Sequence, residues 1–317
     1  MNRKPRYSLG WLALELCPVP LPHHERYRYS AITQRPDYSW PGGRRLAVYI
    51  ALNLEHFAFG EGLGAELAPG GPPPDVLNYA WRDYGNRVGV WRLLELFDQL
   101  ALPVAVLANA AIYDYCPEVM AAFRDRGHEV VAHGRTNSER QSTLGAAEEA
   151  ALIAEATATL THHEGQRPQG WLGPWIAQSH LTPDLLHEAG YSYLLDWCQD
   201  DQPVWFQTRS GRILSVPYPQ EINDIPAIAV RRAGAAEFAD MVVDNFDEML
   251  EQSRQQPLVC GLALHPYIVG QPFRLRHLRR ALAHIAAVAA AAPQRVWLTR
   301  PGAIAAHAHT HLANQIP

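Results

Sequence analysis

The stretch Tyr49-Ile-Ala-Leu-Asn-Leu-Glu-His-Phe57 contains the end of a long apolar run. A carboxylate, Glu55, and an imidazole, His56, follow that run directly. The run starts at Leu46 and is rich in aliphatic residues, which predicts a buried strand. Such a strand does not need Glu55 or His56, because unpaired polar groups cost free energy in a core. Acidic and imidazole side chains at the carboxyl end of a strand are typical of parallel α/β active sites. We therefore expect Glu55 and His56 at the mouth of a barrel.

Predicted strands and helices alternate through most of the chain. The strands are expected at 46–54, 103–108, 129–132, 170–172, 191–195, 213–216, 258–264 and 295–298. Helices are expected at 88–100, 117–126, 144–162, 237–252 and 275–292, with others starting at Thr182, as N-cap before Pro183, and at Pro301. This order predicts parallel strands with right-handed crossovers. The fold class is therefore α/β, and the number of units suits a barrel.

Three predicted strands end at a polar residue, namely Glu55, His133 and His265. In a parallel barrel all three ends lie on the same face, so the sequence predicts that these side chains converge. The stretch Phe57–Asn78 is rich in Gly and Pro and is predicted to be a long loop. A long loop directly after such a strand is more often functional than a linker, and we expect it to act as a lid.

Length and composition favour one domain. The chain has 317 residues and is 48% hydrophobic, which is enough for a single barrel over residues 44–317. Residues 1–43 are rich in proline and aromatic residues, and we expect them to wrap the barrel or a neighbouring subunit. That extension suggests a homo-oligomer. The net charge of -5 argues against non-specific binding of nucleic acid.

The cysteines and the apolar segments bear on location. Four scattered cysteines form no C-x-x-C pair, which argues against structural zinc and disulfides and fits a reducing cytoplasm. Met1–Pro22 imitates a signal peptide, but Glu15 interrupts its short apolar run and no cleavage site is obvious. Ala281–Ala292 is too short to span a bilayer. We expect a cytoplasmic protein without a membrane partner.

The order of these motifs resembles the polysaccharide deacetylase (NodB-homology) superfamily, over about residues 35–307. The family motif T-F-D-D falls on Asn53-Leu-Glu-His56, H-[ST]-x-x-H on His133-Gly-Arg-Thr-Asn137, an aromatic/Pro motif near Trp171–Trp175, a fourth motif near Asp196–Asp201, and L-H-P on Leu264-His-Pro266. The resemblance implies a distorted (β/α) barrel of seven to eight strands. It also implies a hydrolase of carbon–nitrogen bonds other than peptide bonds.

The departures from the family pattern carry more information than the matches. In metal-dependent members the first Asp is the base, while the second Asp and two His hold the metal. Here Glu55 stands at the base position, His56 replaces the ligand Asp, and Asn137 replaces the second His. The third-motif Arg that tethers the base is missing from Gly170–Pro174. These changes resemble the branch of bacterial allantoinases and cyclic imidases. Those enzymes cleave cyclic amides, and the prototype of the branch is thought not to require a metal.

Each main candidate has a catalytic and a structural interpretation. Glu55 would act as general base, a role worth about 10²–10⁴ in rate, or would form an ion pair with Arg135. His56 and His133 would bind one divalent metal such as zinc, with Asn137 or water completing a weak coordination shell. Alternatively, they would form hydrogen bonds to the substrate and the base without a metal. His265, held extended by Pro266, would be a general acid or an oxyanion donor, or a satisfied core histidine.

The predicted substrate contacts rest on weaker arguments. Arg135 and Asn137 could donate to substrate carbonyls or be ordinary loop residues. Analogy with the fold adds further pocket residues: Trp175, Asp201, Tyr218, Asn223 and Asp224. The leading hypothesis is an amide hydrolase with Glu55 as base, acting on a small or cyclic amide. The alternatives are a metal-dependent N-acetyl sugar deacetylase and a catalytically degenerate binding protein of the same fold.

Overall fold

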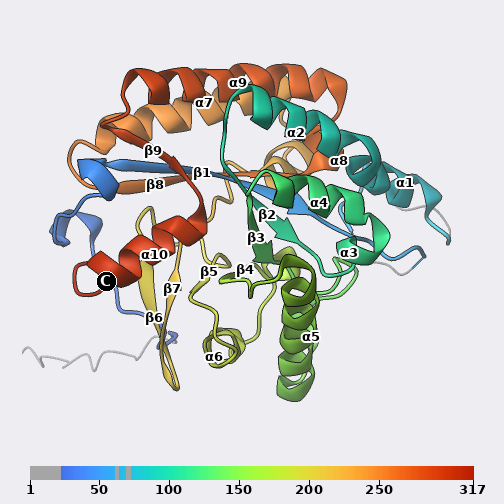
Figure 1. Cartoon of the computed structure of the whole chain (residues 1–317), viewed down its shortest axis with the longest axis horizontal. Coiled ribbons are helices and arrows are strands. Elements are labelled where there is room, and N and C mark those ends of the chain that lie inside the picture. Colours follow the sequence, from blue (N-terminus) through green and yellow to red (C-terminus); the bar gives the residue numbers. More distant parts are fainter. Residues whose placement is uncertain (1–22, 61–63, 69–72) are drawn as a thin grey trace, which may run out of the picture.

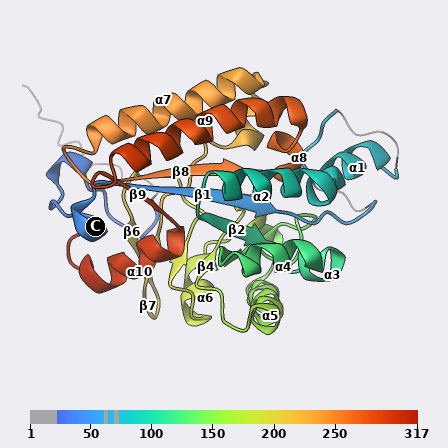
Figure 2. The same ribbon diagram turned by 45° about the horizontal axis from the view of Figure 1, so that its top comes forward.

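A computed structural model describes residues 23–60, 64–68 and 73–317. Its centre is one curled sheet in the order β6-β7-β5-β4-β3-β2-β1-β8, with β9 also paired to β1. Figures 1 and 2 show the sheet curving into an open barrel with helices outside it. The strands are β1 (Leu46–Leu54), β2 (Val104–Ala108), β3 (Glu129–Ala132), β4 (Gly170–Trp171), β5 (Tyr193–Leu194), β6 (Val204–Thr208), β7 (Gly211–Ser215), β8 (Leu258–Leu264) and β9 (Val296–Thr299). The predicted α/β barrel fold is confirmed.

Strand β1 has three partners in this sheet. All nine of its residues are buried, and it pairs in parallel with β2, β8 and β9. The predicted bounds of β1, β3 and β8 are the observed ones, because each is a short apolar run that ends at a polar residue. The pair β6–β7 is antiparallel, and sequence reasoning missed β6. Its exposed Gln207 and polar Thr208 weaken the apolar run, since only its first three residues are buried.

The helices are α1 (Val76–Tyr84), α2 (Val90–Gln99), α3 (Ile112–Tyr115), α4 (Pro117–Asp125), α5 (Ala146–Glu164), α6 (Thr182–Glu188), α7 (Ala235–Gln252), α8 (Pro266–Val269), α9 (Pro272–Ala291) and α10 (Pro301–His311). Helices α7 and α9 lie side by side over β1 and β8 (Figures 1 and 2). Helix α10 lies across the other side of the sheet, where Ile304, Ala305 and Ala308 pack on the inner core with Tyr49 and Ala51.

Several helix boundaries differ from the prediction, and two of the differences have a structural cause. The expected helix 88–100 continues a helical stretch that starts at Val76, inside the predicted loop, and passes through a π-helical turn at Gly85–Gly89. Both glycines are needed, because a Cβ on Gly85 would lie 2.6 Å from the backbone of Tyr267 and one on Gly89 2.2 Å from that of Pro266. Thr182 is not an N-cap, since Leu181 precedes the helix and the Thr182 hydroxyl bonds Glu149 instead.

The described part of the N-terminal segment packs on the barrel. Tyr38 and Trp40 are buried, and Arg35 forms an ion pair with Asp200 at 2.6 Å. Residues 1–22, which include the segment that imitates a signal peptide, lie outside the described residues. The contact of this extension with a second subunit stays a prediction. Among the helices of the described residues, none has the length and apolarity to cross a bilayer.

Candidate active site

The candidate site lies where three parallel strands end. Glu55 directly follows β1, His133 follows β3 and His265 follows β8. Because the carboxyl ends of parallel strands meet at one edge of a sheet, the three side chains come together. Oε1 of Glu55 lies 3.7 Å from Nε2 of His133 and 3.6 Å from Nε2 of His265. Each of these side chains is at most 5% exposed, so their charges act in a water-poor site.

Two neutral donors hold the Glu55 carboxylate. The side-chain amide of Asn137 donates to Oε1 at 2.5 Å, and the hydroxyl of Tyr267 donates to Oε2 at 3.0 Å. Asn86 fixes the backbone here, because its side chain donates to the Glu55 carbonyl oxygen at 2.9 Å. A buried carboxylate is costly unless its oxygens find donors or opposite charges. These contacts therefore allow Glu55 to remain an anion directed at the two histidines.

Asn109, directly after β2, sets the direction of the Asn137 amide. Its Nδ2 donates to Oδ1 of Asn137 at 3.1 Å and to the carbonyl oxygen of His133. Its Oδ1 accepts from the backbone N–H of His56 at 2.8 Å. Since Asn109 donates to the Asn137 oxygen, the Asn137 NH₂ group must face Glu55.

Asp224 stabilises the positive charge of the His265 imidazole. One Asp224 oxygen accepts from Nδ1 of His265 at 2.6 Å, and the other accepts from its backbone N–H at 2.8 Å. Burial disfavours a charged imidazole, but the carboxylates of Asp224 and Glu55 outweigh burial and raise the pKa of His265 to about 10. His265 is therefore an imidazolium at neutral pH, with Nε2–H free to donate on the side of Glu55.

The same charge keeps Glu55 ionised. Burial alone would raise the pKa of Glu55, but the charge of His265 and the nearby imidazoles of His133 and His265 lower it to about 2. Glu55 and His265 therefore titrate as a pair. If His265 gave up its proton, the proton affinity of Glu55 would rise.

His133 presents an unbonded nitrogen to the site. Its Nδ1 lies 2.7 Å from the carbonyl oxygen of Leu172, which can only accept, so Nδ1 carries the hydrogen. Nε2 is then an acceptor in the neutral ring, and it has no hydrogen-bond partner among the described residues. The 3.7 Å separation from Glu55 is too long for a good hydrogen bond, which is the geometry that a bridging water fills.

A cavity of about 130 Å³ opens beside these groups. Its polar residues are Asn53, Glu55, His133, Asn137, Tyr218, Gln220, Asn223, His265 and Tyr267. Its remaining walls are apolar and come from Phe57, Ala65, Leu172, Trp175, Ile176, Ile225 and Pro226. An apolar cavity with a few convergent polar groups is the usual form of a small-molecule site.

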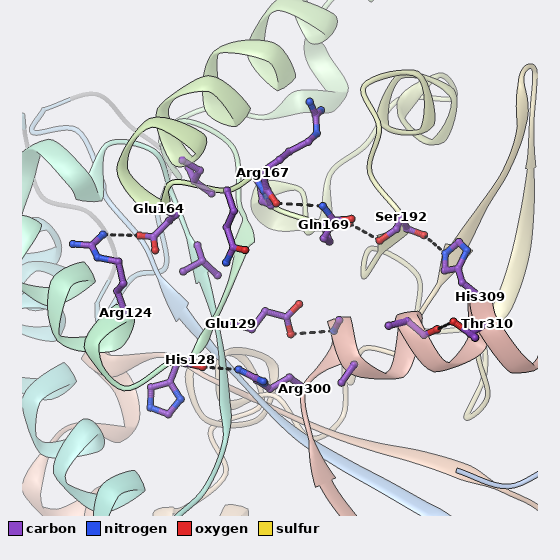
Figure 3. A pocket seen from close by; sticks show the side chains of 18 residues that line it. Arg124, His128, Glu129, Glu164, Arg167, Gln169, Ser192, Arg300, His309 and Thr310 are labelled. Atoms are coloured by element: carbon purple, nitrogen blue, oxygen red, sulfur yellow. Dashed lines mark hydrogen bonds and ion pairs between the residues drawn. The ribbon is translucent and has the colours of Figure 1, made fainter. Parts of the chain in front are cut away.

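A larger hollow of the described residues lies elsewhere. It measures about 760 Å³ and is drawn in Figure 3, between α10 and the amino ends of β3 and β4. Its carboxylate, Glu129, is engaged by the Tyr193 hydroxyl and the Gly302 N–H. At the rim, Arg124 donates to Glu164, and Arg300 donates to the Gly127 carbonyl oxygen. Because active sites of parallel barrels lie at the carboxyl ends of the strands, this hollow is not the candidate site.

Comparison with known proteins finds a family resemblance over part of the chain. Residues 77–194 match the family model described as polysaccharide deacetylase. The resemblance to polysaccharide deacetylases is confirmed over this range.

Solved structures share most of this deacetylase fold. The crystal structure of PuuE allantoinase superposes with a TM-score of 0.78 at 27% identity, covering 90% of this chain and 98% of that one. A structure from Pseudomonas aeruginosa PAO1, described as a probable polysaccharide deacetylase, gives a TM-score of 0.75 at 29% identity, with 86% and 93% covered. The peptidoglycan deacetylase of Helicobacter pylori is 30% identical over 141 residues, or 44% of this chain and 48% of that protein.

Four of the residues predicted for the site lie outside the cavity. One of them, Asp224, does not line it but bonds His265 directly. His56 lines a separate small pocket beside Tyr115, which Glu55 also borders. Arg135 pairs with Glu139 and Glu155, so it does not pair with Glu55 as the structural interpretation had it. Asp201 lies near the amino end of β8, where its carbonyl oxygen accepts from Val259.

The donors in the cavity do not fit a divalent metal held as in metal-dependent deacetylases. His56 and His133 do not share a pocket. The oxygen of Asn137 is occupied by Asn109, and its NH₂ group, which cannot bind a cation, faces Glu55. Within the described ranges, no three His, Cys, Asp or Glu side chains are grouped to hold a metal. The residues present therefore supply hydrogen bonds and charges where a metal shell would need lone pairs.

Several residues of the site were not predicted, among them Asn109, Asn53 and Tyr267. Asn109 follows β2 as Glu55 follows β1, so the strand-end rule would have found it. Asn53 faces the cavity two residues before Glu55 and donates to the Tyr218 hydroxyl at 3.1 Å, as strand alternation requires. Tyr267 had no sequence signal, because its contact with Glu55 spans 212 positions.

Proposed function

We propose that the deacetylase domain hydrolyses a small cyclic amide without a metal, with Glu55 as general base and His265 as general acid. The observation that carries this proposal is the arrangement around Oε1 of Glu55. Two histidine nitrogens face this oxygen at 3.6 and 3.7 Å, each too far for a direct bond. A water or substrate atom between them would touch an ionised base, a neutral acceptor and a charged donor.

The proposed reaction starts with water held between Glu55 and the unbonded Nε2 of His133. Glu55 removes a proton as the water oxygen bonds to the amide carbon. His265 donates its Nε2 proton to the ring nitrogen as the carbon–nitrogen bond breaks. Loss of that proton removes the charge that depresses the pKa of Glu55, so Glu55 becomes a stronger base as the acid step proceeds. A proton then passes from Glu55 back to His265, where Asp224 stabilises it.

The size of the cavity favours a small substrate over a polymer. Sites for drug-sized ligands usually measure about 300–1,000 Å³, and this cavity measures about 130 Å³. The likeness to an allantoinase structure at 27% identity supports the same choice. The partial match to a peptidoglycan deacetylase supports the rival, an N-acetyl sugar substrate. The replaced metal ligands support a third interpretation, a binding protein without catalysis.

Hydrolysis assays separate the three. The full chain, stripped with a chelator and dialysed, is assayed with succinimide, hydantoin and an N-acetylglucosamine oligomer. We expect turnover of a cyclic amide that added zinc does not increase. Acetate release from the sugar oligomer, restored by zinc, would establish the metal-dependent deacetylase instead. Binding of these compounds without turnover of any would support the degenerate protein.

A further inference from the structure

A strained turn forms one wall of the cavity. Trp175 and Ile176 have φ values of 64° and 53°, in the left-handed region that glycine favours. Two adjacent non-glycine residues there are unusual, and a β-branched residue such as isoleucine is a true outlier. Strain of this kind persists only where the surroundings hold the backbone in place, and it concentrates at functional sites.

Several contacts hold the turn Pro174–Ile176. Oδ1 of the buried Asp196 accepts from the N–H of Gly173 at 2.7 Å, just before the turn. The indole N–H of Trp175 donates to the Asn137 carbonyl oxygen at 2.9 Å, which ties the turn to the residue that grips Glu55. The backbone of Gly134 packs closely against the Pro174 ring, because a Cβ on Gly134 would lie 2.6 Å from that ring. The turn is therefore held at its start and through the Trp175 side chain, which connects it to the site.

The fixed turn directs both strained side chains at the cavity. Trp175 and Ile176 line it, and Ile176 also packs against the inner core of the barrel. Ile225 and Pro226 contribute apolar surface of the same cavity. The free volume of about 130 Å³ is close to that of an engineered protein cavity of about 150 Å³ that binds benzene.

We propose that the turn Pro174–Ile176 is the specificity-determining wall of the site, and that Ile176 limits the substrate to a single compact ring of about six to eight heavy atoms. This inference rests on the proposed function, because it names the substrate class of the same cavity. The strained backbone holds the bulky Ile176 side chain against the space for the substrate ring. An unstrained turn would leave this space open.

The test compares succinimide, a single ring, with phthalimide, which adds a fused benzene ring. Dissociation constants are measured by titration calorimetry on Glu55→Gln proteins, and kcat/KM is measured with Glu55 intact. Ile176→Gly should improve phthalimide relative to succinimide by about tenfold or more in both measurements, since a steric clash with one wall is removed. Ile176→Ala should widen the site as well, but its Tm should be lower than that of Ile176→Gly, because alanine keeps the left-handed penalty.

Arg232→Gly is the matched control. Arg232 is exposed, has a φ of 64° and does not line the cavity. Its replacement should raise the Tm and leave the ratio of the two imides unchanged. A ratio that stays within about twofold in both Ile176 variants would overturn the proposal, even if wild-type protein hydrolyses succinimide. Widened binding without hydrolysis by any variant would instead leave the size limit standing and refute the proposed reaction.

Discussion

Replacing Asp224 by asparagine should move the alkaline limit of activity by several pH units. Asp224 contacts His265 twice, at Nδ1 (2.6 Å) and at the backbone N–H (2.8 Å). The asparagine side chain would keep the shape and one of the two acceptors but remove the charge. The pKa of His265, about 10 in the intact site, stands above its ordinary value because of Asp224 first and Glu55 second among the charges. The proposed general acid would therefore lose its main support.

The size of the effect follows from the geometry. Two unit charges about 4 Å apart interact by about 4 kcal/mol at an effective dielectric constant of about 20, which is an upper bound once relaxation is allowed. At about 1.4 kcal/mol per pKa unit, the pKa of His265 would fall by up to about 3 units, to near 7. The reaction needs protonated His265, so activity should fall as pH rises through about 10 in the wild type and through about 7 in Asp224→Asn.

The assay is the pH dependence of kcat/KM for the cyclic amide. The matched control is Asp184→Asn, which removes another buried carboxylate, one that pairs with Arg26 at 2.7 Å and lies outside the cavity. Its alkaline limit should stay where it is in the wild type. An unchanged alkaline limit in Asp224→Asn would refute His265 as the acid, whatever the loss in rate.

Three more substitutions follow from the same contacts. Asn109→Asp replaces a donor to Asn137 by an acceptor, so the Asn137 amide should turn its oxygen to Glu55. The acid limit of the pH–rate profile should then rise by about one to two pH units. An unchanged acid limit would contradict this prediction. Tyr267→Phe leaves one Glu55 oxygen without its donor, and urea unfolding should show a loss of about 1.5–3 kcal/mol at pH 7, against no loss if the contact is idle. His56→Ala should keep kcat/KM within about threefold, measured with and without added zinc, and a zinc-dependent collapse would mean that His56 is a ligand after all.

Sequence reasoning found the sheet well because its signals are local. Strands β1 and β8 are apolar runs, and each is followed by a polar residue. Because parallel strands end at the same edge of the sheet, Glu55 and His265 could be predicted to lie together. Sequence reasoning did not place His56 correctly relative to His133, because the two histidines line different pockets. Adjacency to Glu55 in the chain does not determine which pocket the His56 side chain enters.

The contacts that define the chemistry are long-range and could not be read from the chain. Asp224 meets His265 from 41 positions away, and Asn137 meets Glu55 from 82 positions away. The direction of the Asn137 amide depends on Asn109, a third residue on another strand end. The left-handed φ of Ile176 also has no sequence signal, because neither glycine nor asparagine marks the position.

The most direct test of the account is the kcat/KM of Glu55→Gln for the cyclic amide that the wild type turns over. Glutamine keeps the side-chain length, its oxygen can still accept from Asn137, and the Tyr267 hydroxyl can turn to accept from its NH₂ group, so the fold and the Tm should hold. The account predicts a fall of at least about 10²-fold with little change in succinimide affinity. A Glu55→Gln protein that retains activity within about threefold of the wild type would contradict the claim that Glu55 is the base.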